Sequence, residues 1–390
     1  MRYASIFSGI GGLESAKYKP QFFCEKDPAC QIVLSERHPN INIVEDIKKT
    51  PDVRIEVCVG GWPCQDLTSA GRQKGINGDN SSLFFEMVEF AKRSHAETLI
   101  GENVPNLIRI RGGSEFKIVI STLSEAGYKY ISWRVLNARE FGLPQDRNRL
   151  IIVASRNKKV ALNLHRSIRS EQKIVSKKQV TASGFYWTGG LQSICYSEDY
   201  IPALKVGASP PKGGTSPVAV VYGDIVRKLS PIEALSLQGF VWEGFAHVPK
   251  DGDIYRMAGN AVPRPMGAFA VDTATFNDEI SPIITSSHKP RGNGCYLDGE
   301  LYNIKNDVHY SSRPLSDFLD LISSDSLSPQ ASAGLLTRLI RSNRKIPLSL
   351  FNILYDLSMV RTPLKGTKVD SFKVLHEQLN VSQYISYISK

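Results

Sequence analysis

The sequence predicts an α/β protein whose core is a doubly wound, mostly parallel sheet of seven strands. The first 155 residues alternate short apolar runs with segments of helical periodicity, a pattern typical of a parallel sheet covered by helices. A glycine-rich turn follows the first apolar run and opens a helical segment. The chain has 390 residues, of which 42% are hydrophobic and 22% charged, as in soluble globular proteins.

Each element of this sheet can be placed from its apolar pattern. The expected strands are Tyr3–Phe7, Gln21–Cys24, Ile41–Val44, Ile55–Val59, Thr98–Gly101, Tyr130–Leu136 and Leu150–Ala154. Helices are expected at Ser82–Arg93 and Ser114–Ala126, where apolar residues recur on one face. Ligands of such sheets bind at the carboxyl ends of the strands, so the functional residues are expected there.

The chain divides into four parts. Residues 1–156 and 227–272 are expected to form one domain, which residues 157–226 interrupt as a smaller domain. Residues 273–390 form a C-terminal extension that we expect to be mostly helical, and part of it should pack beside the smaller domain. Its candidate helices are Leu315–Ile322, Ala331–Arg341 and Leu348–Val360.

Charge and composition narrow the functional class. Lys and Arg number 48 against 38 Asp and Glu, a net charge of +10 that favours a polyanionic partner. Residues 157–226 hold nine Lys or Arg against four Asp or Glu, a net +5, which fits either a solvated basic face or a groove that follows phosphates.

Other features exclude two classes of protein. The chain has no apolar run of about 18 residues and no signal-peptide pattern, so we expect a cytoplasmic protein without membrane contact. Its six cysteines form no C-x-x-C pair, and none has a histidine at zinc-ligand spacing, so no metal is expected.

Acidic residues at successive strand ends suggest a nucleoside site. The turn with Gly9, Gly11 and Gly12 is by itself equally compatible with a tight connection. Glu25, 16 residues after Gly9, is placed to accept hydrogen bonds from ribose hydroxyls, and Asp46 to accept one from an adenine amino group. The pattern favours a nucleoside such as S-adenosylmethionine over a dinucleotide.

One cysteine stands in a chemically suggestive place. Cys64 follows the fourth strand in Gly-Gly-Trp-Pro-Cys-Gln, where a turn can hold a thiol exposed, whereas Cys58 lies inside an apolar run. The next segment, residues 66–82, is polar, contains three glycines and carries Arg72 and Lys74. We expect it to be a mobile basic lid.

Five motifs in order closely resemble those of bacterial DNA (cytosine-5)-methyltransferases. They are GGWPCQDLTSAG from Gly60, GENV from Gly101, FGLPQDRNR from Phe141, RKLSPIE from Arg227 with QGF from Gln238, and GNAVP from Gly259. The resemblance covers residues 5–154 and 227–270 and implies the fold of S-adenosylmethionine-dependent methyltransferases. It gives residues 157–226 the place of the family's target recognition domain.

The resemblance also implies residue roles. Cys64 is the nucleophile that adds to cytosine C6, Glu102 hydrogen-bonds N3 and the exocyclic amine and requires a raised pKa, and Arg147 and Arg149 contact the base and steady the site. The implied cofactor residues are Phe7, Gly9, Gly11, Gly12, Leu13, Glu25, Asp46, Ile47, Pro63, Leu83, Asn260, Ala261 and Val262. The expected DNA-contacting residues are Arg72, Lys74, Lys205 and Lys212.

The implied partner is double-stranded DNA with a specific recognition sequence, from which a cytosine is flipped out. The resemblance further implies S-adenosylhomocysteine as the product of the cofactor and a bacterial or phage origin. It implies a monomeric protein, which would act together with a restriction endonuclease that recognises the same site. Two departures bear on cofactor affinity: Ser5 stands where the family usually has Asp, and Lys26 where it often has an aromatic residue. A transfer RNA methyltransferase and a catalytically silent DNA-binding protein remain alternatives.

Overall fold

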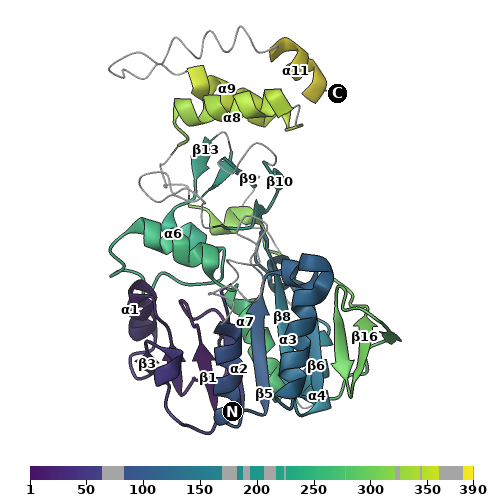
Figure 1. Cartoon of the computed structure of the whole chain (residues 1–390). Helices are drawn as coiled ribbons and strands as arrows, with labels where there is room; N and C mark the ends of the chain where they lie inside the picture. Colours follow the sequence, from purple (N-terminus) through teal and green to yellow (C-terminus); the bar gives the residue numbers. More distant parts are fainter. Residues whose placement is uncertain are drawn as a thin grey trace.

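The structure is a computed structural model. It describes residues 1–63, 83–168, 182–187, 194–205, 217–223, 225–276, 278–320, 326–342, 345–359 and 381–389. Figure 1 shows a lower α/β body, a smaller sheet above it and the C-terminal helices at the top.

All seven predicted strands form and lie side by side in the lower body. They are β1 (Tyr3–Ile6), β2 (Phe22–Cys24), β3 (Asn42–Val44), β4 (Val57–Gly61), β5 (Thr98–Asn103), β6 (Tyr130–Asn137) and β8 (Asn148–Ser155). Their order is β6-β8-β5-β4-β1-β2-β3. The five strands from β5 to β3 are parallel, and β8 is antiparallel to both β5 and β6.

Helices cover both faces of this sheet (Figure 1). They are α1 (Pro28–Arg37), α2 (Leu83–Arg93), α3 (Ser114–Glu125), α4 (Lys158–Leu162) and α7 (Arg264–Asp272). Two more helices, α5 (Pro231–Ser236) and α6 (Asp251–Asn260), pack in a separate hydrophobic cluster. Within β4, Cys58 packs with α2 and α3, whereas Val57 and Val59 pack with α7 on the other face. Because both faces are buried, the strands are continuous apolar runs.

Three strands of the C-terminal extension enlarge the main sheet. β15 (Gly294–Leu297) pairs antiparallel with β6, β16 (Glu300–Ile304) with β15, and β14 (Ile284–Ser286) with β16. The expectation of a mostly helical extension is therefore wrong for this part, and the sheet has ten strands rather than seven. The turn Asp298-Gly299 has positive φ at both residues, as a tight hairpin requires, and an Asp-Gly pair is a hairpin signal.

A second sheet lies between the lower body and the C-terminal helices. It contains β10 (Ser197–Glu198), β9 (Ala182–Tyr186), β12 (Val218–Tyr222) and β13 (Ile225–Lys228), in that order and all antiparallel. We call it the recognition sheet. A separate two-stranded ladder joins β11 (Ile201–Pro202) to β7 (Gln145–Asp146) of the lower body.

The recognition sheet is covered on both faces. Its face toward the lower body, with Val218 and Val220, packs with apolar residues of α5 and α6. Its opposite face, with Phe185 and Val226, packs with α8 (Pro329–Ser342), α9 (Leu348–Met359) and α11 (Val381–Ile388). The expectation that part of the extension packs beside the smaller domain is confirmed.

The structure moves both predicted boundaries of the smaller domain. α4, which follows residue 156, contacts β6 and β8 of the lower body. Its Ala161 is buried, and Val160 and Leu164 pack in a hydrophobic cluster of the lower body. β13 crosses the boundary at 226/227. The exposed lysines at the start of α4 hide this amphipathic pattern in the sequence. The predicted helix Leu315–Ile322 is, in its described part, the 3-10 turn η7 (Leu315–Phe318). No helix among the described residues is long and apolar enough to cross a membrane.

Candidate functional site

The carboxyl ends of β1 to β5 meet at one edge of the main sheet, and the described residues of the predicted site gather there. The glycine turn follows β1, Glu25 follows β2 and Asp46 follows β3. Glu102, in β5, is paired in register with Gly61 at the end of β4. Because β8 runs antiparallel to β5, its first residues lie at the same edge.

Glu25 holds the glycine turn against the end of β2. The backbone N–H of Gly9 donates to Glu25 Oε2 (2.7 Å), and that of Asp27 donates to Oε1 (2.7 Å). Burial raises the pKa of the Glu25 carboxyl, and these two N–H groups oppose the rise. Gly9 has φ of +56° and open space where a Cβ would lie, so a ligand can approach its backbone closely.

Gly12 joins the beginning of the chain to the late segment after α6. A Cβ atom on Gly12 would overlap the carbonyl oxygen of Val262. A Cβ on Gly267, in α7, would overlap the carbonyl oxygen of Gly12. Leu13 and Val262 are buried in one hydrophobic cluster. These contacts explain how a motif from the far end of the chain comes to lie beside the glycine turn.

Replacing Gly12 by Ala should weaken cofactor binding by about tenfold or more and lower stability by roughly 1–3 kcal/mol, the usual cost of overpacking. The added methyl group would push the turn away from Val262. Calorimetric titration and thermal unfolding measure the two effects. Gly334→Ala is the matched control, because a Cβ in that part of α8 meets nothing within 4 Å. Wild-type affinity in Gly12→Ala would contradict this role for the turn.

The other predicted cofactor residues lie along the same edge. Asp46 is exposed, and its Oδ1 accepts from the N–H of Lys48 (3.0 Å), which caps a short 3-10 turn that begins at the buried Ile47. Pro63 and Leu83 are half-buried, the first just after β4 and the second at the start of α2.

Three further cofactor candidates lie at the ends of other elements. Phe7 follows β1 with φ of +56°, a left-handed conformation that is uncommon outside glycine. Asn260 is the exposed last residue of α6, and Ala261 is its C-cap.

Ser5 has a structural partner in this chain. Its hydroxyl donates to Glu14 Oε1 (3.0 Å), directly behind the glycine turn. Burial raises the pKa of Glu14 to about 7, and the hydrogen bond from Ser5 and the charge of Arg37 oppose the rise. A Ser fits here because an Asp would place a second carboxyl group beside the buried Glu14.

Glu102 is buried, with 8% of its surface exposed. A Cβ on Gly61 would lie 2.8 Å from Glu102 Oε2, so only glycine leaves room for this carboxylate at the end of β4. Burial raises the pKa of Glu102, and the guanidinium groups of Arg149 and Arg147 oppose the rise. The expected upward shift is thus present, and it favours a carboxyl group that can donate a proton.

Asn103 fixes the chain two residues before Cys64. Its Nδ2 donates to the carbonyl oxygen of Trp62 (3.2 Å). The Trp62 ring is buried against Phe84, with ring centroids 4.9 Å apart, and contacts Gly101 so closely that a Cβ there would lie 2.7 Å away. Asn103 is a residue of the site that no sequence pattern had predicted, although it follows the acid in the motif GENV.

The two arginines of the QDRNR motif differ in surroundings. Arg149 Nε lies 2.9 Å from Glu102 Oε1, an ion pair at the centre of the site. Arg147 is 1% exposed. Its guanidinium donates to the carbonyl oxygens of Leu204 (2.7 Å), Gly259 (2.8 Å) and Ala261 (2.7 Å). In this structure Arg147 joins the motif of β7 and β8 to residues 194–205, here called the recognition segment, and to the late segment after α6.

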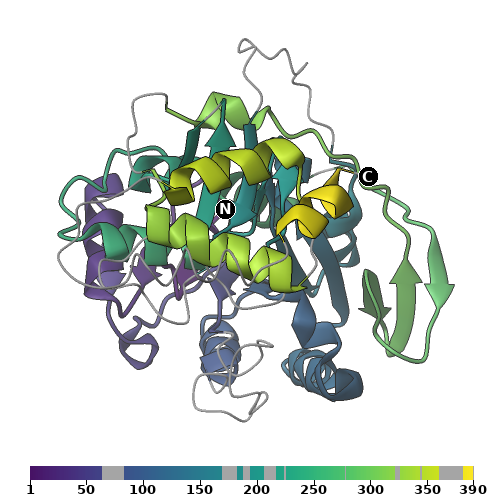
Figure 2. The same ribbon diagram turned by 90° about the horizontal axis from the view of Figure 1, so that it is seen from above.

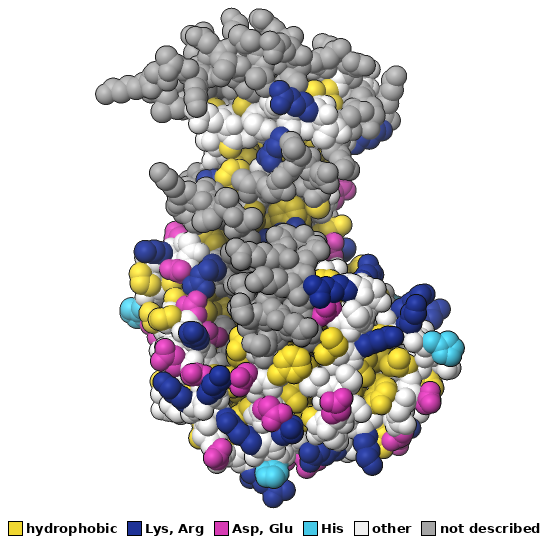
Figure 3. All heavy atoms as spheres, in the orientation of Figure 1, with side chains coloured by type: hydrophobic (Ala, Val, Ile, Leu, Met, Phe, Trp, Pro, Cys, Tyr) yellow, Lys and Arg dark blue, Asp and Glu magenta, His cyan; other side chains and the backbone are white. Residues whose placement is uncertain are grey.

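Several predicted residues lie outside the described part of the chain: Cys64, the expected lid at 66–82 with Arg72 and Lys74, and Lys212. Lys205 is described and exposed, with Nζ 4.4 Å from the centroid of the Tyr186 ring. On the face shown in Figure 3, the magenta acidic side chains gather mostly on the lower body, whereas blue Lys and Arg side chains are visible on the upper part as well.

The sequence of this chain matches one family of known proteins. Residues 1–193 match the family model described as C-5 cytosine-specific DNA methylase. The type II methyltransferase M2.BsuMI of Bacillus subtilis (strain 168) is 36% identical over 286 residues, which cover 67% of this chain and 72% of that protein. The type II methyltransferase M.Bsp6I of Bacillus sp. (strain RFL6) is 28% identical, covering 68% of this chain and 96% of that protein.

A solved structure supports the fold independently. The DNMT2 mutant structure of Spodoptera frugiperda aligns with a TM-score of 0.50 at 14% identity, covering 70% of this chain and 99% of that chain. The chain described here belongs to the family of C-5 cytosine-specific DNA methylases.

Proposed function

We propose that this protein methylates C5 of a flipped-out cytosine in duplex DNA through a covalent bond between Cys64 and C6. The observation that carries the proposal is the junction of β4 and β5. Gly61 is in register with Glu102, and Asn103 holds the carbonyl of Trp62, so the last described residues before Cys64 lie beside the buried carboxyl group. A nucleophile and a proton donor on adjacent strand ends can act on C6 and N3 of one pyrimidine ring.

The residues of the site have complementary roles in this chemistry. Addition of the Cys64 thiolate to C6 places negative charge on N3, which Glu102 in its protonated form neutralises. The enamine that results carries its nucleophilic carbon at C5 and can attack a methyl donor. The donor is then released as S-adenosylhomocysteine. A base such as water takes the C5 proton, the bond between C6 and the Cys64 sulfur breaks to release the thiolate, and N3 returns its proton to Glu102, which restores the aromatic ring. Arg149 orients Glu102 through the contact of its Nε with Glu102 Oε1, and Arg147 positions the segments on which the site is built.

The residues at the carboxyl ends of β1, β2 and β3 offer the hydrogen-bond acceptors that S-adenosylmethionine needs. This cofactor supplies an activated methyl group when bound. Glu25 can accept from ribose hydroxyls while it holds the Gly9 backbone, and the exposed Asp46 can accept from an adenine amino group. Gly12 and Val262 would fix the floor of this site, with the other predicted cofactor residues around it.

The recognition sheet, together with α8 and α9, forms the module that would read the DNA sequence. The basic charge of residues 157–226 favours contact with phosphates. Among the relatives, M2.BsuMI and M.Bsp6I are named type II methyltransferases. We include a role as the modification enzyme of a restriction–modification system in the proposal, with a restriction endonuclease that acts on the same DNA site.

Methyl transfer from tritiated S-adenosylmethionine to duplex DNA, single-stranded DNA and transfer RNA tests the proposal. We expect label in duplex DNA, and bisulfite sequencing should place it at one cytosine of a short recurring sequence. Label in transfer RNA alone would support the RNA alternative. Binding of DNA without any transfer would support a silent DNA-binding role. Either result would overturn the proposal.

A further inference from the structure

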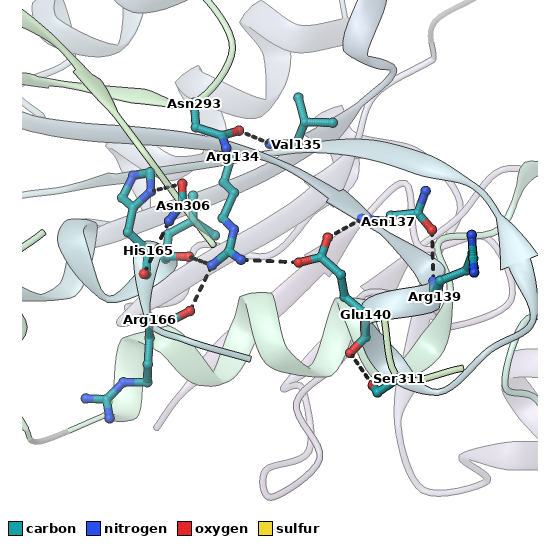
Figure 4. Close-up of polar contacts among 11 residues, drawn as sticks. Arg134, Val135, Asn137, Arg139, Glu140, His165, Arg166, Asn293, Asn306 and Ser311 are labelled. Carbon is teal, nitrogen blue, oxygen red and sulfur yellow. Dashed lines mark hydrogen bonds and ion pairs between the residues drawn. The ribbon is translucent and has the colours of Figure 1, made fainter. Parts of the chain in front are cut away.

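Residues 310–320, here called the strap, connect the outer strands of the main sheet to the recognition sheet. Figure 2 shows this green segment leaving the β14–β16 strands and passing along one side of the molecule toward the C-terminal helices. The chain before the strap is held to the lower body by partly buried polar contacts: His165 Nδ1 lies 3.1 Å from Asn306 Oδ1, and Asn293 Oδ1 accepts from the N–H of Val135 (2.8 Å) (Figure 4). Burial lowers the pKa of His165 to about 4, so this contact stays neutral at neutral pH.

The strap binds the turn that precedes the QDRNR motif. Ser311 donates its backbone N–H to the carbonyl of Arg139 (3.0 Å) and its hydroxyl to the carbonyl of Glu140 (3.3 Å) (Figure 4). The N–H of Arg313 donates to the carbonyl of Gly142 (3.0 Å). Three hydrogen bonds to one short turn fix the strap to the lower body at this point.

A buried network leads from that turn to the site. Arg134 Nη2 donates to Glu140 Oε2 (3.3 Å), and Glu140 Oε1 accepts from the N–H of Asn137 (2.8 Å). Asn137 Nδ2 in turn donates to Asp146 Oδ1 (2.7 Å) and Asn148 Oδ1 (3.0 Å). Asp146 and Asn148 lie on either side of Arg147 in the chain, and Asn148 also precedes Arg149. The turn that the strap binds therefore also orients the two arginines of the site.

The other end of the strap binds the recognition side. The N–H of Leu315 donates to Asp199 Oδ1 (2.9 Å), next to β10. The N–H of Asp320 donates to Glu233 Oε1 (2.7 Å), and its carbonyl accepts from Arg227 Nη2 (2.7 Å). Arg227, in β13, and Glu233 are themselves a buried ion pair at 2.6 Å.

One side chain lies at the meeting point of all three parts. The Arg139 guanidinium, from the lower body, lies over the rings of both Tyr200 from the recognition segment and Tyr310 from the strap, with its Cζ 4.1 and 4.4 Å from their centroids. A cation over two aromatic faces is attracted to both. Arg139 therefore contacts both the recognition segment and the C-terminal extension from its place beside the main sheet.

We propose that Arg139 and the strap are positioning elements for DNA methylation: they hold the recognition sheet at a fixed distance and angle from the Glu102–Arg149 pair. The inference rests on the proposed function. Methyl transfer requires the flipped base to lie within about 0.5 Å of its productive position, whereas the bound sequence is held by a separate sheet. A tie between the two sheets reduces the motion that would misplace the base.

The test compares Arg139→Leu, which removes the cation, with Arg139→Lys, which retains it, and with Arg291→Leu as a control on the exposed loop between β14 and β15. We expect Arg139→Leu to lower kcat/KM for cognate duplex DNA about tenfold and to reduce discrimination against non-cognate sequences. Affinity for S-adenosylmethionine should be unchanged. Arg139→Lys should recover most of the loss, and Arg291→Leu should behave as wild type.

A second readout does not depend on activity. Hydrogen exchange without DNA should become faster at the backbone N–H groups of Ser311, Arg313 and Leu315 in Arg139→Leu and stay unchanged in Arg291→Leu. Wild-type kcat/KM in Arg139→Leu, or unchanged exchange in the strap, would overturn the inference. So would an equal loss of cofactor affinity, because that would indicate general damage to the lower body. A wild-type protein that methylates no DNA would instead refute the proposed function and leave the exchange result to be judged by itself.

Discussion

Replacing Glu102 by Gln is expected to lower kcat for methyl transfer by about 10²- to 10⁴-fold, the usual contribution of general acid–base catalysis. Gln has nearly the same shape as Glu and can donate a hydrogen bond to N3, but it cannot transfer a proton. The structure raises the pKa of Glu102 by burial and leaves space for its carboxylate beside Gly61. Affinities for DNA and S-adenosylmethionine should change little.

The rate of methyl transfer should also depend on pH in one direction. Because the protonated form of Glu102 acts, the wild-type rate should fall as the pH rises through its raised pKa, and Glu102→Gln should lose that descending limb. Glu115→Gln is a matched control, since Glu115 is also buried and paired with an arginine but lies in α3. A loss in Glu102→Gln no larger than that in Glu115→Gln would contradict a role of Glu102 in proton transfer.

Replacing Arg147 by Met is expected to cost stability on the order of 3 kcal/mol or more. The change leaves three buried carbonyl groups without their donor, and each such loss costs about 1–3 kcal/mol. The thermal midpoint should fall by roughly 5–10 °C, and cofactor affinity should fall with it because Arg147 holds Ala261 beside the glycine turn. Differential scanning calorimetry and calorimetric titration measure the two changes.

Arg149→Met provides the contrast. Arg149 pairs with Glu102 and donates to the carbonyl of Asn148, so its loss should change the thermal midpoint by only about 1–2 °C while methyl transfer falls at least about tenfold. If both variants lost the same stability, or if Arg147→Met kept the wild-type midpoint, the division between a positioning and a chemical arginine would be wrong.

The sequence predicted those parts of the fold that depend on local pattern. All seven expected strands of the main sheet form at the apolar runs that predict them, and Glu25 lies against the Gly9 turn as its spacing suggested. Strand ends in a parallel sheet share one edge, so the position of each motif along the chain was enough to bring Glu25, Asp46 and Glu102 to that edge.

The sequence did not predict features that depend on contacts between distant segments. The strands at 284–304 carry no long apolar run and form because β6 offers an unpaired edge and Trp133 requires Gly294 beside it. Arg147 was expected at the base, but nothing local shows that the carbonyls of Leu204, Gly259 and Ala261 converge on it. The same is true of Arg139, whose two tyrosines lie 61 and 171 residues away along the chain.

The assignment of Cys64 as the nucleophile can be tested directly by trapping the enzyme on DNA. Duplex DNA in which 5-fluorocytosine replaces cytosine blocks the final elimination, so an enzyme that has transferred its methyl group stays covalently attached to C6. With S-adenosylmethionine present, wild-type protein should form an adduct that denaturation does not release and that peptide mapping places at Cys64, whereas Cys64→Ser should form none. An adduct at another residue, or undiminished methyl transfer by Cys64→Ser, would contradict the proposed mechanism.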